Sequence, residues 1–443
     1  MSAPAQKFLT LPNDWKPRAH QVPFLEYMDT GGSEEKRACI VWHRRAGKDS
    51  AAINWTAGEA AQKRGTYLHM FPKATQARKL LWYGIDKKGR RMIDQAFPPQ
   101  YRQGTNNSEM RIDWFGSYWY ACGADNFNTL VGGNTRGIVF SEWSLTNPSS
   151  WKYLAPILRE NGGWAIFPYT PRGPNHGKKM ADMAKKNPKW FFEILTVDDT
   201  AVFTKKDIEE ERAAGVSDEL IDQEYYCSFD SPNEGSYYGK YLVDATRDDR
   251  IGQFPWDPDR PVHTFWDIGI RDENGIWFIQ RHGSQYHAID YEETTDAGLP
   301  ELAKMVLNKP YVYGSHTAGH DIGHREYGSG ETRTKRARAL GIKFHMAPKL
   351  SLKEGIDVTK TQIALTCFDE KKCEDGLNAL WHYHREYDET EQRWMQDPDH
   401  DWSEGGASSF RYFAVSDKKR LRDRKQPPAI EAADSSGGDW MSH

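Results

Sequence analysis

The first half of the chain alternates short apolar runs with longer stretches of helical character. Runs of strand length occupy residues 38–42, 66–71, 119–121, 137–140 and 164–168. Continuous apolar runs of this length are typical of strands buried on both faces, and strands separated by helices form parallel sheets of βαβ units. The pattern predicts an α/β domain in which helices flank a parallel sheet.

The pattern changes in the second half. Residues 263–268, 275–282 and 286–291 have the length of strands and are joined by short turns. Three such strands predict an antiparallel meander, and therefore a second sheet of different architecture. The boundaries that follow from these patterns are a first domain at 1–230, a linker rich in Gly, Pro, Asp and Tyr at 231–257, a second domain at 258–418, and a disordered tail at 419–443.

Composition narrows the class of protein. With 443 residues the chain is long enough for two domains. Its formal net charge of -4 argues against a simple nucleic-acid binder, although a local basic channel is compatible with it. Five cysteines without metal-ligand spacing predict reduced thiols and a cytoplasmic location, and the absence of a run of about 18 apolar residues argues against a membrane span.

A candidate phosphate-binding loop follows the first apolar run. Residues 42–49 read Trp-His-Arg-Arg-Ala-Gly-Lys-Asp and precede a helical stretch at 50–63. Backbone N–H groups of such a loop cradle phosphate oxygens, and Lys48 would reach the β- and γ-phosphates. The motif is imperfect. Trp42 stands where the motif has its first glycine, and Asp49 stands where a hydroxyl residue is expected after the lysine.

A carboxylate ends the buried strand predicted at 137–140. Such strands carry a metal-binding Asp and then a Glu that polarises the attacking water. Glu142 fits the second role, and Ser141 stands where the Asp is expected. The alternative is a core strand that ends in a solvated glutamate.

Three acidic residues suggest a metal site in the second half. Asp267 lies in an apolar strand that opens the meander, where a charge is costly unless it is paired or binds metal. That beginning suits an RNase H-like fold, in which two divalent ions need several shared carboxylates. Asp321 and Asp401 come from two further separated elements and complete the predicted set. The alternative for Asp401 is a helix N-cap.

Several motifs together resemble those of the large terminase subunit of tailed phages. Residues 44–48 resemble its arginine-rich Walker A motif, and 141–142 resemble a Walker B variant. The segments 17–21, 71–77 and 170–176 are similar to its adenine-reading, post-strand and coupling motifs, in the family's order. In the second half the resemblance extends over residues 266–269, 320–341 and 400–413.

The resemblance implies a fold and a set of site residues. The fold is α/β, with a P-loop ATPase domain whose parallel sheet is flanked by helices, followed by an RNase H-like nuclease domain with a mixed sheet. Catalysis would use Glu142 in the ATPase and Asp267, Asp321 and Asp401 in the nuclease. By the resemblance, Gln21 reads adenine, Arg45 and Lys48 hold phosphates, and Thr170 senses the state of the γ-phosphate. The predicted ATP-binding set also includes Arg44, Gly47, Asp49 and Ser141.

Two departures from the family pattern concern the metal ligands. The loop has a carboxylate, Asp49, where a hydroxyl is expected, and the strand has a hydroxyl, Ser141, where a carboxylate is expected. This suggests that the two ligands of Mg²⁺ have exchanged positions. The alternative is that Ser50 supplies the hydroxyl and Asp49 caps the helix. In the nuclease, Ser408 stands where an Asp is expected, so Asp401 is the predicted third ligand and Glu404 its reserve.

The predicted function is ATP-driven translocation of double-stranded viral DNA into a procapsid, with metal-dependent cutting of concatemeric DNA. The implied cofactors are ATP and Mg²⁺, or Mn²⁺ at the nuclease. The implied partners are DNA, the portal protein, the small terminase subunit and further copies in a ring, in the host cytoplasm and not in the mature virion. Candidate phosphate contacts are Arg333, Lys335, Arg336 and Arg338. The rival functions are a helicase or repair ATPase with a non-cutting second domain, and a non-enzymatic DNA-binding or capsid-assembly protein.

Overall fold

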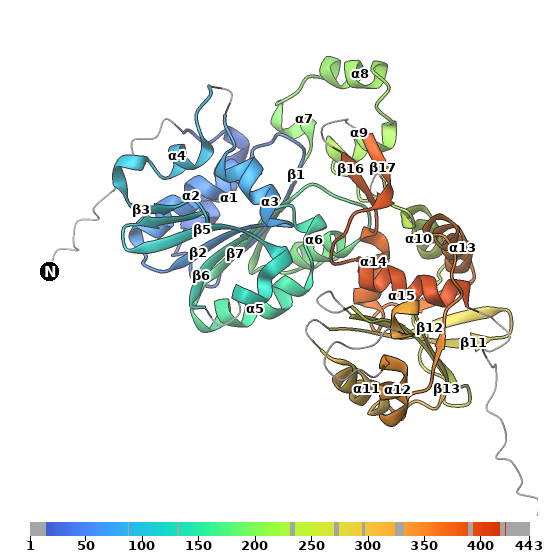
Figure 1. Ribbon diagram of the computed structural model, residues 1–443. Helices are drawn as coiled ribbons and strands as arrows, with labels where there is room; N and C mark the ends of the chain where they lie inside the picture. The colour runs from blue at the N-terminus through green and yellow to red at the C-terminus, as the bar shows by residue number, and fades with distance from the viewer. Residues whose placement is uncertain are drawn as a thin grey trace, which may run out of the picture. The chain divides into compact units, whose positions relative to one another are not determined.

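The chain folds into two compact units that are interleaved in sequence (Figure 1). The computed structural model describes residues 15–86, 88–130, 133–230, 235–269, 274–294, 297–323, 332–388, 393–416 and 421. The first unit comprises residues 1–244 and 377–404, and the second comprises 245–376 and 405–443. The chain first passes from one unit to the other after residue 244, within the predicted linker. No sequence pattern predicted that residues 377–404 belong to the first unit. Apart from Leu421, the predicted tail at 419–443 lies outside the described residues.

The first unit is built on an eight-stranded sheet in the order β3-β4-β5-β2-β6-β7-β1-β8. The strands from β5 to β8 along this order are parallel, and β3, β4 and β5 form an antiparallel edge. The bounds are β1 (Arg37–Trp42), β2 (Thr66–Phe71), β3 (Arg102–Asn106), β4 (Arg111–Trp114), β5 (Ser117–Gly123), β6 (Thr135–Phe140), β7 (Trp164–Tyr169) and β8 (Trp190–Leu195). The predicted parallel sheet is confirmed, and the antiparallel edge and β8 are additions to it.

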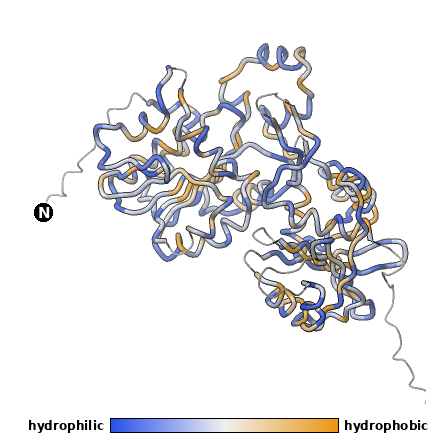
Figure 2. Tube along the Cα trace, in the orientation of Figure 1, coloured by the Kyte–Doolittle hydropathy of each residue, from blue (hydrophilic) through white to orange (hydrophobic). Residues whose placement is uncertain are grey.

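Helices cover both faces of this sheet. Alternate residues of β1 enter two separate cores, Ile40 on the side of α1 and α2 and Val41 on the side of α5 and α6. Figure 2 shows the central strands as a hydrophobic band. The helices are α1 (Val22–Asp29), α2 (Lys48–Gln62), α3 (Ala74–Gln76), α4 (Met92–Ala96), α5 (Ser149–Glu160), α6 (His176–Lys186) and α7 (Val197–Thr200), with the short helices η1 (Ala19–Gln21), η2 (Ala77–Trp82), η3 (Pro99–Tyr101), η4 (Ala124–Leu130) and η5 (Trp143–Leu145).

The polar helical stretch after β8 forms two short helices. Both α8 (Lys205–Ala213) and α9 (Asp218–Glu224) begin at a capping hydroxyl, that of Thr204 and that of Ser217. Gly215 separates them with a φ of 95°, a conformation that suits glycine.

The segment predicted as a linker contains regular structure. Helix α10 (Gly239–Arg247) and strand β9 (Ile251–Gly252) lie within it. Tyr238, Leu242 and Ala245 are fully buried at helical spacing, so an apolar face stabilises α10 in a stretch whose Gly and Tyr content suggested irregular chain.

The second unit is built on a seven-stranded mixed sheet in the order β14-β13-β10-β11-β12-β15-β9. Strands β10, β11 and β12 are the predicted antiparallel meander, and β13 and β14 extend it in parallel to β10. The bounds are β10 (Val262–Asp267), β11 (Asn274–His282), β12 (Gln285–Thr294), β13 (Tyr313–Ala318), β14 (Phe344–Met346) and β15 (Thr366–Asp369). The predicted fold class, a parallel α/β sheet followed by a mixed sheet, is confirmed.

Helices also cover both faces of the second sheet. On β10, Trp266 packs into a core with α11 and α12, while Phe265 contacts Phe413 of α15 with ring centroids 5.0 Å apart. The helices that belong wholly or mainly to this unit are α11 (Leu299–Leu307), η6 (His320–Gly323), α12 (Arg333–Ala339), α13 (Leu352–Ala364) and α15 (Glu404–Val415). Residues 377–404 carry most of α14 (Glu374–His382) and the hairpin of β16 (Arg385–Asp388) and β17 (Arg393–Pro398).

Candidate active sites

The loop between β1 and α2 is a tight turn at a helix N-terminus. Arg45 and Gly47 both have positive φ, 67° and 87°. A Cβ at Gly47 would lie 2.7 Å from Nε2 of Gln21, so both the backbone conformation and the available space require glycine there. Backbone N–H groups at the start of a long helix favour an anion, which is the property the sequence predicted for this loop.

Two side chains from the N-terminal segment fix this loop. The Nε2 of Gln21 donates to the carbonyls of Ala46 and Gly47, both at 3.1 Å, and Oε1 accepts from the backbone of Arg18. The Nε2 of His20 lies 2.9 Å from the Ala46 carbonyl and therefore donates to it. Gln21 is 2% exposed and so acts as a buried brace of the loop. Its contact with adenine stays a prediction.

Lys48 contacts the predicted coupling motif directly. Its ammonium is buried and donates to Oγ1 of Thr170 at 2.8 Å and to the Trp42 carbonyl at 3.2 Å. Thr170 follows β7, which lies between β6 and β1 in the sheet. Phosphate oxygens would form stronger, charge-assisted bonds to the ammonium than these neutral acceptors do. A ligand that binds the Lys48 ammonium would therefore break its hydrogen bond with Thr170.

Asp49 and Ser141 are hydrogen-bonded to each other. The Ser141 hydroxyl donates to Oδ1 of Asp49 at 2.5 Å, and Nε2 of His69 lies 3.2 Å from the same oxygen. Burial alone would raise the pKa of Asp49, but His69, Ser141 and the charge of Lys48 hold it below its usual value. The carboxylate is therefore ionised at neutral pH and adjoins a hydroxyl, a donor set that suits Mg²⁺.

The alternative in which Asp49 caps the helix does not match this geometry. The N-cap of α2 is Gly47, which has no side chain, and the Asp49 carboxylate is turned to Ser141 and His69. The two residues of the suggested ligand exchange, Asp49 and Ser141, are thus in contact. Their binding of a metal ion stays a prediction.

We expect the two exchanged residues to be energetically coupled. Asp49→Ser should lower Mg²⁺-dependent ATP hydrolysis, and Asp49→Ser with Ser141→Asp should recover part of the loss, because the pair again offers one carboxylate and one hydroxyl. Contacting residues show coupling energies of about 0.5–3 kcal/mol in double-mutant cycles. Turnover measured over a Mg²⁺ titration in all four proteins checks this, and purely additive losses would contradict it.

Glu142 follows β6 in a strained and underbonded state. Its φ is 51°, a left-handed conformation that costs about 1–3 kcal/mol for a residue other than glycine and is frequent at functional sites. Its Oε2 is buried and has no hydrogen-bond partner among the residues that the structure describes. A buried carboxylate oxygen with free acceptor capacity can orient a water molecule.

We expect Glu142→Gln to bind ATP and to fail at hydrolysis. The amide keeps the size of the side chain but cannot accept a proton, and loss of a general base typically lowers turnover by about 100-fold or more. Titration calorimetry with ATP and a steady-state assay measure the two effects separately. Glu160→Gln, at the exposed end of α5, is the matched control. Loss of ATP binding in Glu142→Gln would show that Glu142 has another role.

The two loop arginines differ in their contacts. Arg45 is exposed, and its carbonyl accepts from Arg18 at 3.0 Å. The guanidinium of Arg44 lies 3.7 Å from the Glu224 carboxylate, which also pairs with Arg172 of the coupling motif. Glu224, at the end of α9, therefore joins the loop to the coupling motif. No pattern in the sequence signalled this residue, because it lies in a short, mostly polar helix without a motif.

In the second unit the structure brings the elements of Asp267 and Asp321 together. Asp267 ends β10, and Asp321 lies in η6, three residues after the end of β13. These strands are parallel neighbours, with Trp266 opposite Ala318, so both acidic residues leave the same edge of the sheet. Arg333 of α12 donates to the Ile268 carbonyl at 3.2 Å, directly beyond Asp267. The side chain of Asp321 lies outside the described part of the structure.

Asp401 and Glu404 have partners of their own. The Oδ1 of Asp401 accepts from the backbone and hydroxyl of Ser403, and Oδ2 lies 2.9 Å from Nε2 of His382. Burial would raise the pKa of Asp401, but His382 and Ser403 hold it well below its usual range. Glu404 pairs with Nδ1 of His400 at 2.8 Å and raises the pKa of that histidine. Asp401 is in the first unit, and its Oδ1 and carbonyl accept from backbone N–H groups in the turn that leads into α15 at Glu404, so the capping alternative stays open.

The predicted DNA-contact residues share one short helix. Lys335, Arg336 and Arg338 of α12 are exposed, whereas Arg333 is half-buried beside Ile268. Three exposed cations close to the edge that carries Asp267 suit phosphate contacts. Their binding of DNA stays a prediction.

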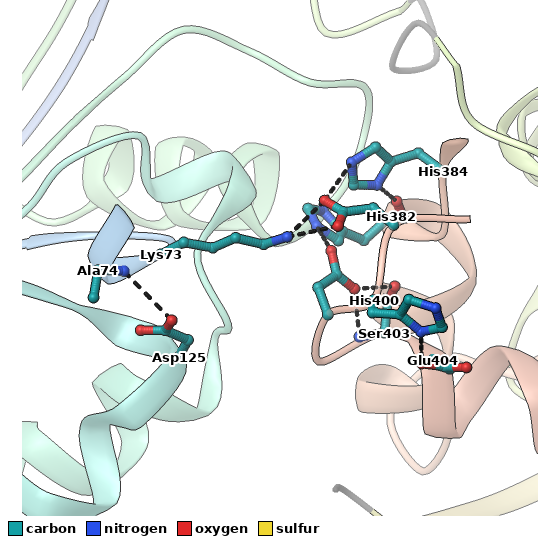
Figure 3. Close-up of polar contacts among 10 residues, drawn as sticks. Lys73, Ala74, Asp125, His382, His384, His400, Ser403 and Glu404 are labelled. Atoms are coloured by element: carbon teal, nitrogen blue, oxygen red, sulfur yellow. Dashed lines mark hydrogen bonds and ion pairs between the residues drawn. The ribbon is translucent and has the colours of Figure 1, made fainter. Parts of the chain in front are cut away.

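A histidine–carboxylate network in the first unit was not predicted (Figure 3). The Lys73 ammonium binds both carboxylate oxygens of Asp399, at 2.6 and 2.7 Å, and Asp399 lies 3.6 Å from Nε2 of His384. Next to it, His382 contacts Asp401. Lys73 falls in the segment 71–77 that carries part of the family resemblance. The two histidines of the pattern His382-x-His384 were the feature of the sequence that could have indicated a site in this segment.

Solved structures of large terminases are among those similar to this chain. The large terminase of a thermophilic bacteriophage, solved also with ATP-γ-S, is 15% identical and covers 90% of this chain and 98% of its own, with a TM-score of 0.40. The ATPase domain of the Thermus phage P74-26 large terminase is 18% identical and covers 48% of this chain and 94% of its own, with a TM-score of 0.41. The large terminase nuclease of another thermophilic phage, with bound cobalt, is 13% identical over 41% of this chain and 98% of its own, with a TM-score of 0.31.

Sequence comparisons add no relative. No model of a known protein family matches the sequence, and no curated protein matches it. Solved large terminases are thus among the structures that this chain resembles, as its motifs indicated. Within the described residues, no helix is both long and apolar enough to span a membrane.

Proposed function

We propose that this chain is the large subunit of a phage terminase, an ATPase that drives double-stranded DNA into a procapsid and a nuclease that cuts concatemeric DNA. The observation that supports it most is the arrangement at the ends of three adjacent strands. Strand β1 leads to Lys48, β7 to Thr170 and β6 to Ser141 and Glu142. Ammonium, sensor hydroxyl, metal-ligand pair and water-polarising carboxylate thus meet at one edge of the sheet.

In the ATPase we propose a role for each residue. Lys48, with Arg44 and Arg45 on the same loop, would bind phosphate oxygens, and Gln21 would hold the loop and contact adenine. Mg²⁺ would be held by Asp49 and Ser141, and it would neutralise charge that develops on the phosphates. Glu142 would orient the water, and Thr170 would exchange its hydrogen bond with Lys48 as the phosphate leaves.

In the nuclease, Asp267 and Asp321 would hold divalent ions at the end of the parallel pair β10 and β13. Two such ions activate a hydroxide and stabilise the leaving oxygen. For a third carboxylate the sequence offers Asp401 and Glu404, which lie in the first unit. The roles proposed for Asp267 and Asp321 do not depend on that choice. The cations Arg333, Lys335, Arg336 and Arg338 of α12 would contact DNA phosphates.

The partners follow from the same function. A packaging motor contacts double-stranded DNA and the portal of the procapsid, and it receives DNA from a small terminase subunit in the host cytoplasm. Motor subunits act as rings with heterologous interfaces, in which one copy completes the site of the next. We propose this assembly for the chain.

The test separates the proposal from its rivals. Purified full-length protein should hydrolyse ATP, with DNA stimulating the rate, and should cut plasmid DNA in Mg²⁺ or Mn²⁺. ATP hydrolysis without cutting would favour a helicase or repair ATPase, and the absence of both would favour a DNA-binding or assembly protein. Cutting that persists in excess EDTA would reject the metal-ion mechanism of the second unit.

A further inference from the structure

Three side chains of the first unit converge on a small volume, and two of them, His382 and His384, have no part in the proposed function. The third, Asp401, is also a candidate for the third nuclease carboxylate. His382 ends α14, and His384 follows two residues later (Figure 3). Asp401 lies beyond the β16–β17 hairpin in the sequence. Each offers one ligand atom, and these atoms all lie within 4.8 Å of one another. Two imidazole nitrogens and one carboxylate oxygen form a donor set that borderline divalent metals prefer.

His384 is oriented as metal-binding histidines are. Its Nδ1 lies 2.7 Å from the carbonyl of His382, and because a carbonyl can only accept, Nδ1 carries the proton. Nε2 therefore presents a lone pair. A hydrogen bond from the remote ring nitrogen to a backbone carbonyl is the usual way in which a protein fixes a metal-ligating imidazole.

Asp401 is held in the same manner. Its Oδ1 accepts from the backbone of Ser403 at 2.9 Å and from the hydroxyl of Ser403 at 2.6 Å, so one oxygen is committed to orientation. The other, Oδ2, lies 2.9 Å from Nε2 of His382. Two ligand atoms at about 2.0–2.2 Å from one tetrahedral ion lie about 3.3 Å apart, so this pair has close to the required separation.

The surroundings suit a buried cation. The side chains of His382 and Asp401 are each 6% exposed, and the ring of Trp402 stacks on His382 at 4.8 Å. The neighbouring carboxylate of Asp399 is neutralised by Lys73. Asp401 is thus a buried negative charge beside imidazoles, and a divalent ion would compensate it more fully than a shared proton does.

We propose that His382, His384 and Asp401 bind one divalent transition-metal ion of the Zn²⁺ class. The ion would join the end of α14 to the segment before α15 and would close the base of the β16–β17 hairpin. It would differ from the ions of the nuclease in its nitrogen ligands, and its role would be structural. Metal binding at this site is measured without ATP hydrolysis or DNA cutting, so its failure can be distinguished from the failure of either activity.

The test uses untagged full-length protein, stripped with a chelator and held in excess Mg²⁺, which occupies sites made only of oxygen ligands. Titration with Co²⁺ should give visible absorption bands that saturate at one equivalent, and Zn²⁺ should abolish them. Zn²⁺ should also raise the melting temperature, because it binds the folded state.

Variants locate the ion. His384→Ala and Asp401→Asn should each weaken Co²⁺ binding by about 100-fold or more, and Ser403→Ala, which removes only an orienting hydroxyl, by about 10-fold. His400→Ala, an exposed histidine paired with Glu404, is the matched control and should bind as the wild type does. Asp267→Ala should also keep the Co²⁺ bands, which separates this site from the nuclease. His384→Gln replaces His384→Ala if the alanine variant does not fold. The absence of saturable bands in the wild type, or equal bands in the wild type and Asp401→Asn, would overturn the proposal.

Discussion

Lys48→Ala is expected to lower ATP hydrolysis by about 100- to 1,000-fold, the usual cost of removing a group that stabilises transition-state charge. Lys48 is buried at the start of α2 and bound to Thr170 and to the Trp42 carbonyl. Alanine removes the only charge on that side chain and leaves two neutral groups behind, so folding should survive while the transferred phosphoryl group loses its ammonium. A coupled assay of steady-state turnover, at saturating ATP and Mg²⁺, measures the effect.

Two controls make this result specific. Lys206→Ala removes a lysine whose side chain is 85% exposed on α8, and it should leave turnover unchanged. Thermal unfolding of Lys48→Ala should show a cooperative transition like that of the wild type. Cutting of plasmid DNA by the same variant should persist, because Asp267 and Asp321, which are proposed to hold its metal ions, belong to the other unit. Unchanged ATP turnover in Lys48→Ala would remove the basis for calling this loop a phosphate site.

Asp267→Ala is expected to abolish metal-dependent cutting of plasmid DNA and to spare ATP hydrolysis. A metal ion contributes several kcal/mol of transition-state stabilisation, so its loss corresponds to at least about a 100-fold lower rate. Asp267 ends β10 beside the Asp321 segment, and water cannot replace a carboxylate there without changing the position of the ions. Conversion of supercoiled to linear plasmid, followed over time in Mn²⁺ and in Mg²⁺, measures the rate.

The matched control for this variant is Asp357→Ala. Asp357 is an exposed carboxylate of α13 in the same unit, and its loss should change neither activity. Asp321→Ala should behave as Asp267→Ala does. Full cutting by Asp267→Ala, in a protein shown to bind DNA, would mean that the edge formed by β10 and β13 is not the cutting site.

The parts of the fold that the sequence predicted are those with strong apolar signals. The strands β1, β2 and β7 are runs buried on both faces, so their patterns could hardly arise in a helix or a loop. The hairpin of β3 and β4 was not predicted, because its exposure alternates over only four or five residues each and its sequence is largely polar. Short edge strands take their stability from the partner strand, which a local pattern does not contain.

Site residues within a sequence motif could be predicted. Residues that reach the site only through tertiary contacts could not. Lys48, Asp49 and Glu142 follow strands with recognisable motifs, and even the exchange of Asp49 and Ser141 was visible from residue types. His69 reads as part of a buried strand, and only the packing of α2 against β2 brings it to Asp49. Glu224 lies far along the chain from Arg44, in a helix without an apolar pattern.

The interleaving of the two units bears on how such a protein can evolve. The chain passes between units after residues 244, 376 and 404, so neither unit is one continuous stretch of sequence. An exchange of genes with a single junction in 231–257 would separate Lys73 from Asp399, and it would combine a hairpin from one ancestor with a sheet from another. The two units are therefore poorly suited to inheritance as independent modules. Functional recombinants would need a second pair of junctions around residues 377–404.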